Sequence, residues 1–137
     1  MNPNTIPRVQ QENERQAPGR EIICLPVTAI TATSAGAAQT LLTVPGENLF
    51  QVGAFKVCNH TAGAVTFSMH IVPSGGSAGD GNLVYSEESV PANDTVTLAE
   101  RNTLMAPEGS TIEIHAGSTP ALNIILYGVL ISSGDPL

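Results

Sequence analysis

The stretch "VTFSMHIV" (65–72) alternates between apolar and polar side chains. Its odd-numbered residues, from Val65 to Ile71, are apolar, whereas the even-numbered residues from Thr66 to His70 are polar. A period of two is typical of a β-strand that has one face in the core and the other in solvent. The stretch therefore predicts a half-buried strand whose polar face, including His70, is exposed.

The same alternation recurs on both sides of this stretch. It is present in "GAFKVCN" (53–59), "TVTLA" (95–99) and "TIEIHA" (111–116). In contrast, "LNIILYGVLI" (122–131) is apolar on both faces, which predicts a central strand that is covered on both sides or lies at a subunit interface. Turn-forming residues separate the runs at about ten-residue spacing, as in sandwiches and barrels. We therefore predict an all-β fold, an antiparallel β-sandwich of jelly-roll-like type.

The connection "NHTAGA" (59–64) joins two of these predicted strands. Asn59 and Gly63 are residue types that tolerate the positive φ of tight hairpin turns. We therefore expect the strands on either side of it to be neighbours in one sheet.

The first 21 residues differ from the rest of the chain. They contain Pro3, Pro7 and Pro18 and almost no apolar periodicity, and proline favours extended backbone. We predict an extended N-terminal arm over residues 1–21, which becomes ordered only on a partner, and a β-sandwich domain over residues 22–137. At about 3.3 Å per residue such an arm spans roughly 70 Å and reaches a neighbouring protein. A tail without a role is the alternative.

Charged residues make up only 12% of the chain, against about 25% in an average soluble domain. The net charge of −7 lies entirely on residues 22–137, where Lys56 and Arg101 are the only Lys or Arg. Such an acidic domain is unsuited to binding nucleic acid. A weakly charged surface is easier to explain if much of it faces other protein.

The cysteines and the N-terminal region indicate in which cellular compartment the protein is made. Cys24 and Cys58 are the only cysteines and form no CxxC motif, so we expect two buried free thiols, with a disulfide between them as the alternative. The apolar run 22–30 is too short to span a membrane and contains Pro26. No secretory signal precedes it. We therefore expect synthesis in a cytoplasm and no membrane partner.

The glycine-rich stretch "PSGGSAGDG" (73–81) invites comparison with ligand-binding loops. A phosphate-binding P-loop needs a Lys after its last glycine and a helix behind it, and this stretch has neither. A calcium loop needs several closely spaced acidic residues, and Asp80 is the only one within it. We interpret the stretch as a surface loop between two strands, shaped to fit a partner.

Other candidates for chemistry are sparse. His70 and His115 lie on the polar faces of their strands and could meet across a sheet to bind a metal, but without an HxH or Cys partner we expect exposed structural histidines. No GxSxG motif accompanies the Ser, His and Asp residues. Glu87 and Glu88 are adjacent and so point to opposite faces of a strand, unlike a glycosidase pair. We predict no enzyme activity, no catalytic residue, no cofactor and no metal site.

The stretch "VCNHTAGAVTFSMHIVPSGGSAGDGNLVYSEESVPANDTVTL" (57–98) resembles small virion structural proteins of tailed bacteriophages. The resemblance extends over residues 56–131. The matching positions are Asn59, Thr61, Ala64, Val65, Thr66, His70, Val72, Pro73 through Gly79, Asn82, Leu83, Val90, Pro91, Ala92, Asn93, Thr95, Val96 and Leu98. Members of this class decorate capsids or belong to necks and tails, and the resemblance implies a β-sandwich.

The resemblance, the arm and the acidic domain together predict a capsid decoration (cement) protein. It would be a homotrimer that binds the major capsid protein on the outer capsid surface of the virion and staples the head non-covalently. A neck, tail or fibre component is one alternative, and a host-receptor or carbohydrate-binding module is another. The expected partner contacts are Ile6, Pro7, Arg8, Val9, Arg15, Arg20, Ser74, Gly75 and Gly76.

Overall fold

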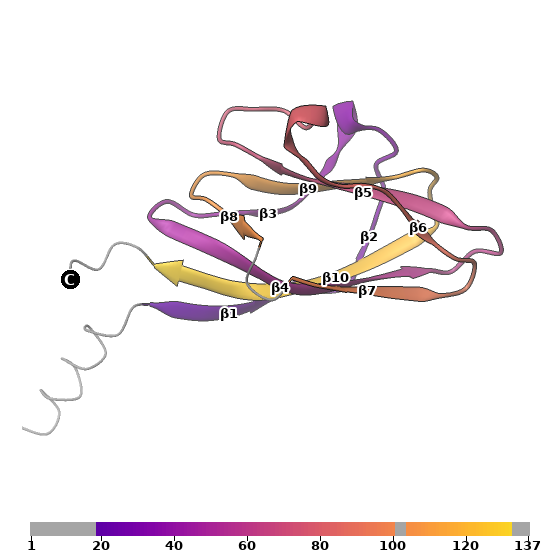
Figure 1. The fold of residues 1–137 in the computed structure, drawn as a ribbon, viewed down its shortest axis with the longest axis horizontal. Coiled ribbons are helices and arrows are strands. Elements are labelled where there is room, and N and C mark those ends of the chain that lie inside the picture. Colours follow the sequence, from indigo (N-terminus) through magenta and orange to yellow (C-terminus); the bar gives the residue numbers. More distant parts are fainter. Residues whose placement is uncertain (1–18, 101–103, 133–137) are drawn as a thin grey trace, which may run out of the picture.

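The computed structural model describes residues 19–100 and 104–132, which form a two-layer β-sandwich (Figure 1). Sheet A has the strand order β1-β10-β4-β7, and two short strands, β2 and β8, pair with β10 and β4. Sheet B has the order β3-β9-β5-β6. The strands of sheet A are β1 Arg20–Cys24, β2 Thr28–Ala29, β4 Asn48–Asn59, β7 Thr95–Ala99, β8 Met105–Ala106 and β10 Leu122–Ser132. Those of sheet B are β3 Gln39–Thr43, β5 Val65–Val72, β6 Leu83–Val90 and β9 Thr111–Ala116.

Every strand pairing is antiparallel, so the prediction of an all-β, jelly-roll-like sandwich is confirmed. Two short 3-10 turns, η1 (Ala35–Ala37) and η2 (Asp80–Asn82), lie over the outer side of sheet B (Figure 1). Within the described part of the chain, no helix has the length and apolar character needed to cross a membrane.

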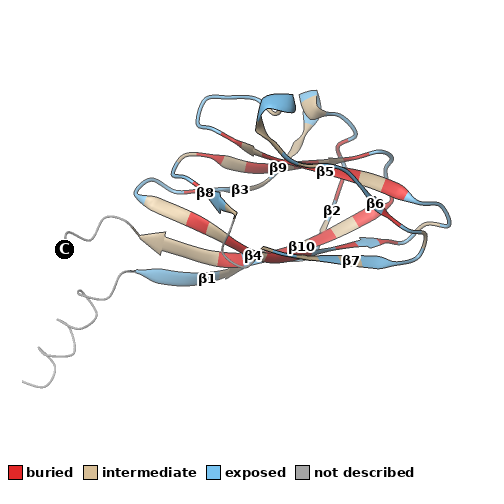
Figure 2. Ribbon diagram, in the orientation of Figure 1, coloured by how far each residue is buried: buried red, intermediate tan, exposed pale blue. Residues whose placement is uncertain are grey.

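The two sheets enclose a single core between them, where the buried residues concentrate (Figure 2). On β5, Val65, Phe67 and Met69 are buried in this core, as the alternating pattern predicts. The ring of Phe55 on β4 packs edge-on against Phe67, with centroids 6.1 Å apart, and against Tyr85 on β6 at 5.2 Å. Aromatic contacts across the two layers therefore help to hold the sheets together.

The hairpin prediction for residues 59–64 is wrong, because β4 belongs to sheet A and β5 to sheet B. The connection is a corner that crosses between the layers, built around the buried side chain of Asn59. The Asn59 amide donates to the carbonyls of Gly63 (2.8 Å) and Val90 (3.0 Å) and accepts from the N–H of Thr61 (2.9 Å). A buried polar group needs such partners, and here they fix a crossover in place of a tight turn.

Strand β1 begins at Arg20, so Arg20 and Glu21 belong to sheet A, although the predicted arm included both. The strand pairs with β10 in a register that places Arg20 opposite Ile131 and Cys24 opposite Tyr127. The remainder of the predicted arm, residues 1–18, lies outside the described residues.

Strand β10 lies in the interior of sheet A, between β1 and β4, which confirms that it is a central strand. Its pairing with β4 shifts between Tyr127 and Gly128, where β4 accommodates Gly53 as an extra residue. Both positions require glycine, because neighbouring groups approach the backbone too closely to leave room for a Cβ atom. A Cβ on Gly128 would lie 2.6 Å from Cζ of Phe50, and one on Gly53 would lie 2.9 Å from the ring of Tyr127.

Candidate functional site

The outer side of sheet A carries an apolar surface that the described part of the chain leaves uncovered. We define this apolar face by residues of β1 and β10 whose register places them on one side of the sheet: Ile22, Cys24, Ile125, Tyr127 and Val129. Ile22 is 78% exposed and Tyr127 is 50% exposed. Contiguous apolar surface of this kind is characteristic of protein–protein contacts.

A shallow hollow of about 350 Å³ lies on the apolar face, between Cys24, Ile125 and Tyr127. Ala54, Lys56 and Thr97 from the neighbouring strands β4 and β7 also line the hollow. The Tyr127 ring lies directly over Gly53. The arrangement presents an aromatic ring and aliphatic groups beside a single ammonium group, and can therefore receive an apolar side chain of a partner.

The apolar face was not among the predicted contact residues, although its signal was present in the sequence. Residues 122–131 are apolar at successive positions. This pattern predicted either a strand that the chain covers on both faces or a strand with one face in a subunit interface. The structure buries Ile124 and Leu126 in the core and leaves Tyr127 exposed, so within the described residues only the inner side is covered. This outcome favours the interface interpretation.

Of the predicted contacts, the structure describes Arg20 and the segment Ser74–Gly76, all of them exposed. Arg20 starts β1 in sheet A, whereas Ser74–Gly76 follow the end of β5 in sheet B, with Gly75 in the left-handed region (φ 80°). Both lie at the end of the sandwich where β1 starts and β5 ends (Figure 1). The other five predicted contacts, Ile6, Pro7, Arg8, Val9 and Arg15, lie outside the described residues.

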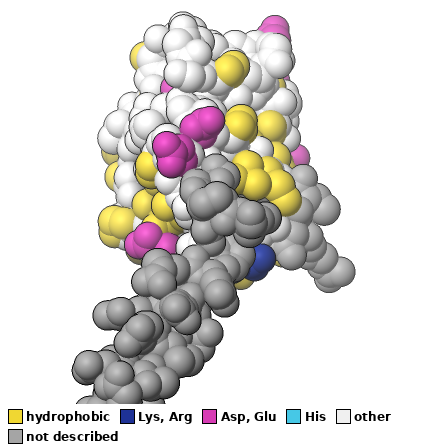
Figure 3. All heavy atoms as spheres, turned by 90° about the vertical axis from the view of Figure 1, so that its left-hand side faces the viewer, with side chains coloured by type: hydrophobic (Ala, Val, Ile, Leu, Met, Phe, Trp, Pro, Cys, Tyr) yellow, Lys and Arg dark blue, Asp and Glu magenta, His cyan; other side chains and the backbone are white. Residues whose placement is uncertain are grey.

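Figure 3 shows this end of the molecule, where hydrophobic side chains and acidic side chains lie side by side. Glu108 belongs to it, and its carboxylate accepts the backbone N–H of Glu47 at 2.7 Å. Ser74 also lies here, against Gly109, since a Cβ on that glycine would come within 3.1 Å of it. The loop after β5 is thus packed against the turn before β9.

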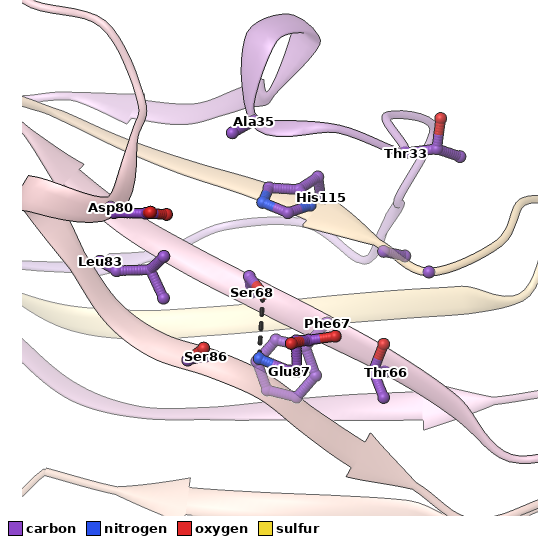
Figure 4. A pocket seen from close by; sticks show the side chains of 12 residues that line it. Thr33, Ala35, Thr66, Phe67, Ser68, Asp80, Leu83, Ser86, Glu87 and His115 are labelled. Carbon is purple, nitrogen blue, oxygen red and sulfur yellow. Dashed lines mark hydrogen bonds between the residues drawn. The ribbon is translucent and has the colours of Figure 1, made fainter.

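The outer side of sheet B is polar and carries a pocket of about 260 Å³. Figure 4 looks into it, with Thr33 and Ala35 on one side of His115 and Ser68 and Glu87 on the other. The hydroxyl of Ser68 accepts the backbone N–H of Glu87 at 3.0 Å. Glu87 has a φ of 49° at a bulge in the β5–β6 pairing, and bulges of this kind re-aim side chains.

The two histidines meet across sheet B, but the prediction that both are exposed is wrong. His70 is fully buried, because the loop containing Gly79 and Asn82 covers the outer side of β5. Nε2 of His70 and Nε2 of His115 are 3.1 Å apart. The ring centroids are 5.2 Å apart and the two ring planes are inclined by 28° to each other.

The pKa of His115 lies below its ordinary value of 6.5, mainly because burial disfavours the charged imidazolium. The neighbouring His70 lowers this pKa further, whereas the carboxylate of Glu87 acts in the opposite direction. His115 is therefore neutral at pH 7.

No group of three or more His, Cys, Asp or Glu side chains suited to a metal is found among residues 19–100 and 104–132. Cys24 and Cys58 are free thiols, as expected, but both are exposed, so the prediction that they are buried is wrong. Both side chains lie on the outer side of sheet A, and the described residues do not cover them.

No protein-family model matches the chain, and no curated protein matches it. Similarity is found with solved structures of infectious bursal disease virus. The Gx strain gives a TM-score of 0.54 at 12% identity over 89% of this chain, the Gt strain 0.48 at 13% over 88%, and a VP2 subviral particle 0.45 at 14% over 88%. The chain spans about a third of the length of these chains, 34–35%. At this identity the likeness to the Gx strain structure shows a shared β-sandwich fold.

Proposed function

We propose that this chain is a virion structural protein of a tailed bacteriophage that decorates the capsid as a cement protein. The observation that carries the proposal is the apolar face of sheet A. Removing apolar surface from water contributes about 25 cal/mol per Å², so an uncovered face with Ile22 and Tyr127 at its surface favours association.

Two further observations support a place in a virion. The segment from Asn59 to Leu98 carries the pattern that resembles phage virion proteins, and it contains β5, η2, β6 and most of β7. The fold is shared with a chain from a virus structure. The negative charge of residues 22–137 suits the outside of a head, away from packaged DNA.

In the proposed assembly, three copies associate through their apolar faces, and the N-terminal residues of each copy extend to the major capsid protein. These contacts would stabilise the head by burying protein surface, without any covalent bond or catalysed reaction. A standard protein interface buries about 1,600 Å², and three linked binding sites strengthen attachment through avidity. The protein would be made in the host cytoplasm and would act on the outer capsid surface.

The test is a deletion of residues 1–18, chosen because β1 starts at Arg20 and stays intact. Heads that lack the protein are mixed with the full-length or the shortened chain and sedimented. We expect the shortened chain to remain folded by circular dichroism and to stay in the supernatant. Sedimentation of the shortened chain with heads at full-length affinity would contradict the stapling role of the arm.

Electron microscopy of virions carrying the labelled protein separates the proposed function from its nearest alternative. A decoration protein labels positions over the whole capsid surface. A neck, tail or fibre component labels one vertex or the tail alone, and that pattern would reject decoration while leaving a virion role.

A further inference from the structure

The buried His70 connects the glycine-rich loop to sheet B. Its Nδ1 lies 3.1 Å from the carbonyl oxygen of Gly79 and 3.0 Å from Oδ1 of Asn82. Asn82 in turn accepts the N–H of Gly79 at 3.0 Å and donates to the carbonyl of Ser77 at 2.8 Å. A single imidazole thus fixes the last part of the loop between β5 and β6.

These contacts determine where the protons of both histidines lie. The oxygens of Gly79 and Asn82 can only accept, so Nδ1 of His70 carries a proton. In a neutral His70 the other nitrogen, Nε2, is then an acceptor. Because it faces Nε2 of His115 at 3.1 Å, the N–H of that contact belongs to His115.

One additional proton leaves this arrangement intact. It binds Nδ1 of His115, which has no hydrogen-bond partner among the described residues, and the Nε2–H of His115 still donates to His70. The carboxylate of Glu87 on β6 acts on His115 through its charge. Asp80 on η2 lines the same pocket as His115, and Glu113 on β9 lies opposite His70 in the strand pairing. The negative charge of Glu87 favours a single positive charge on the pair.

A second additional proton cannot be accommodated. It would bind Nε2 of His70 and place two N–H groups face to face at 3.1 Å, with a second positive charge on a fully buried ring. We propose that the His70–His115 pair is an acid-operated latch, which holds the loop 73–82 on sheet B while it carries at most one extra proton and releases the loop when both rings are charged.

Release would change the outer surface of sheet B. The loop carries Ser74, Gly75 and Gly76, which are exposed at one end of the sandwich, and Asp80, which lines the pocket beside His115. A partner bound to these residues at neutral pH would meet a different surface in acid. The inference concerns the loop alone and does not depend on a role in capsid decoration.

The experiment follows the full-length protein by NMR from about pH 7.5 to about pH 4.5, the range that brackets imidazole titration. At neutral pH we expect the ring nitrogen signals to show His70 protonated at Nδ1 and His115 at Nε2. In acid we expect the amides of Gly79 and Asn82 to lose hydrogen-exchange protection, by about tenfold per pH unit once opening binds one more proton. The amide of Ile30, bonded to the carbonyl of Leu122 at 2.9 Å, reports opening of the whole domain.

Two variants make the experiment specific. His115→Gln keeps an N–H donor but cannot titrate, so the loop amides should stay protected in acid. His60→Gln changes the exposed third histidine and should behave as the unmodified protein. The unmodified protein alone is decisive if a variant fails to fold. Loop protection that does not change with pH, or that falls only together with protection of Ile30, would overturn the proposal, as would a His70 protonated at Nε2 at neutral pH.

Discussion

The outer sides of the two sheets differ in polarity and in how far the described residues cover them. Sheet B presents polar side chains outward and then covers them with its own chain, so that Ser68 and His70 are buried. Sheet A presents apolar side chains outward and leaves them bare, with Ile22 and Tyr127 exposed. Within residues 19–100 and 104–132, the chain therefore covers much of the outer side of sheet B but leaves the apolar face of sheet A uncovered.

Hydrogen bonding explains why sheet B can bury its polar side. Burying an unpaired polar group costs about 1–3 kcal/mol, and the described residues contain no buried side-chain nitrogen or oxygen without a hydrogen-bond partner. Asn82 and Gly79 supply the oxygens that His70 needs. The apolar face of sheet A requires no such partners, only the exclusion of water, which a second protein surface can provide.

The largest expected effect contrasts the two sides of β10 itself. Leu126 is buried in the core, so Leu126→Ala should lower the free energy of unfolding by about 2–5 kcal/mol through lost packing and a cavity. Urea unfolding followed by circular dichroism measures it. Tyr127→Ala, one residue along on the apolar face, is the matched control and should change the monomer by less than about 1 kcal/mol. Equal losses would mean that the outer side is also part of the monomer core.

The second effect concerns association. Tyr127→Asp places a charge in the centre of the apolar face and should weaken self-association by about 2 kcal/mol or more, roughly 30-fold, while the monomer stays folded. Analytical ultracentrifugation over a concentration series measures the change. Ser89→Asp, at an exposed position of β6, adds the same charge to sheet B and should leave association unchanged. Equal weakening by both variants would point to net charge as the cause.

The third effect tests the cover of sheet B. Asn82→Ala removes the amide that contacts His70, Gly79 and Ser77 and should cost about 1–2 kcal/mol of unfolding free energy. Asn48→Ala removes one local bond, to the carbonyl of Gly46 at 2.8 Å, and should cost less than about 0.5 kcal/mol. Thermal unfolding of the two variants side by side gives the comparison. A smaller loss for Asn82 than for Asn48 would show that the loop is not held by this network.

The smallest expected effect is the contribution of His115 to the pH dependence of the free energy of unfolding. Its pKa is lowered in the folded state by burial and by His70, so just below pH 6.5 the unfolded chain binds more protons than the folded one. Stability should therefore fall as the pH drops through 6.5 towards the lower pKa of the folded protein. The difference in urea midpoint between the unmodified protein and His115→Gln, measured against pH, isolates this contribution. A difference that does not vary with pH would show that His115 titrates alike in both states.

Alternation in the sequence predicted β5, β7, β9 and the second half of β4 with their inward sides, as Phe67 and Met69 on β5 illustrate. It could not predict what covers the outward side, because period-two patterning records only which residues share a face. For His70 the cover depends on the loop folding back over β5, and for Tyr127 on the absence of any described segment over β10. The corner at Asn59 was missed for a related reason: a residue type that suits a hairpin also suits a buried cap when its amide finds distant carbonyls such as that of Val90.

The position of β10 has a consequence for how the chain reaches its native state. This strand is the last one described, yet it lies between β1 and β4 and joins them. Sheet A therefore cannot close until residues from 122 onward are available, and pairing β1 with β10 brings together segments about a hundred residues apart, which is slow because of the entropy of closing long loops. During that interval β4 has an unpaired edge with apolar neighbours, the situation in which newly made β-proteins aggregate. Folding yield in the cell should then depend on temperature and expression rate more strongly than the stability of the finished sandwich would indicate.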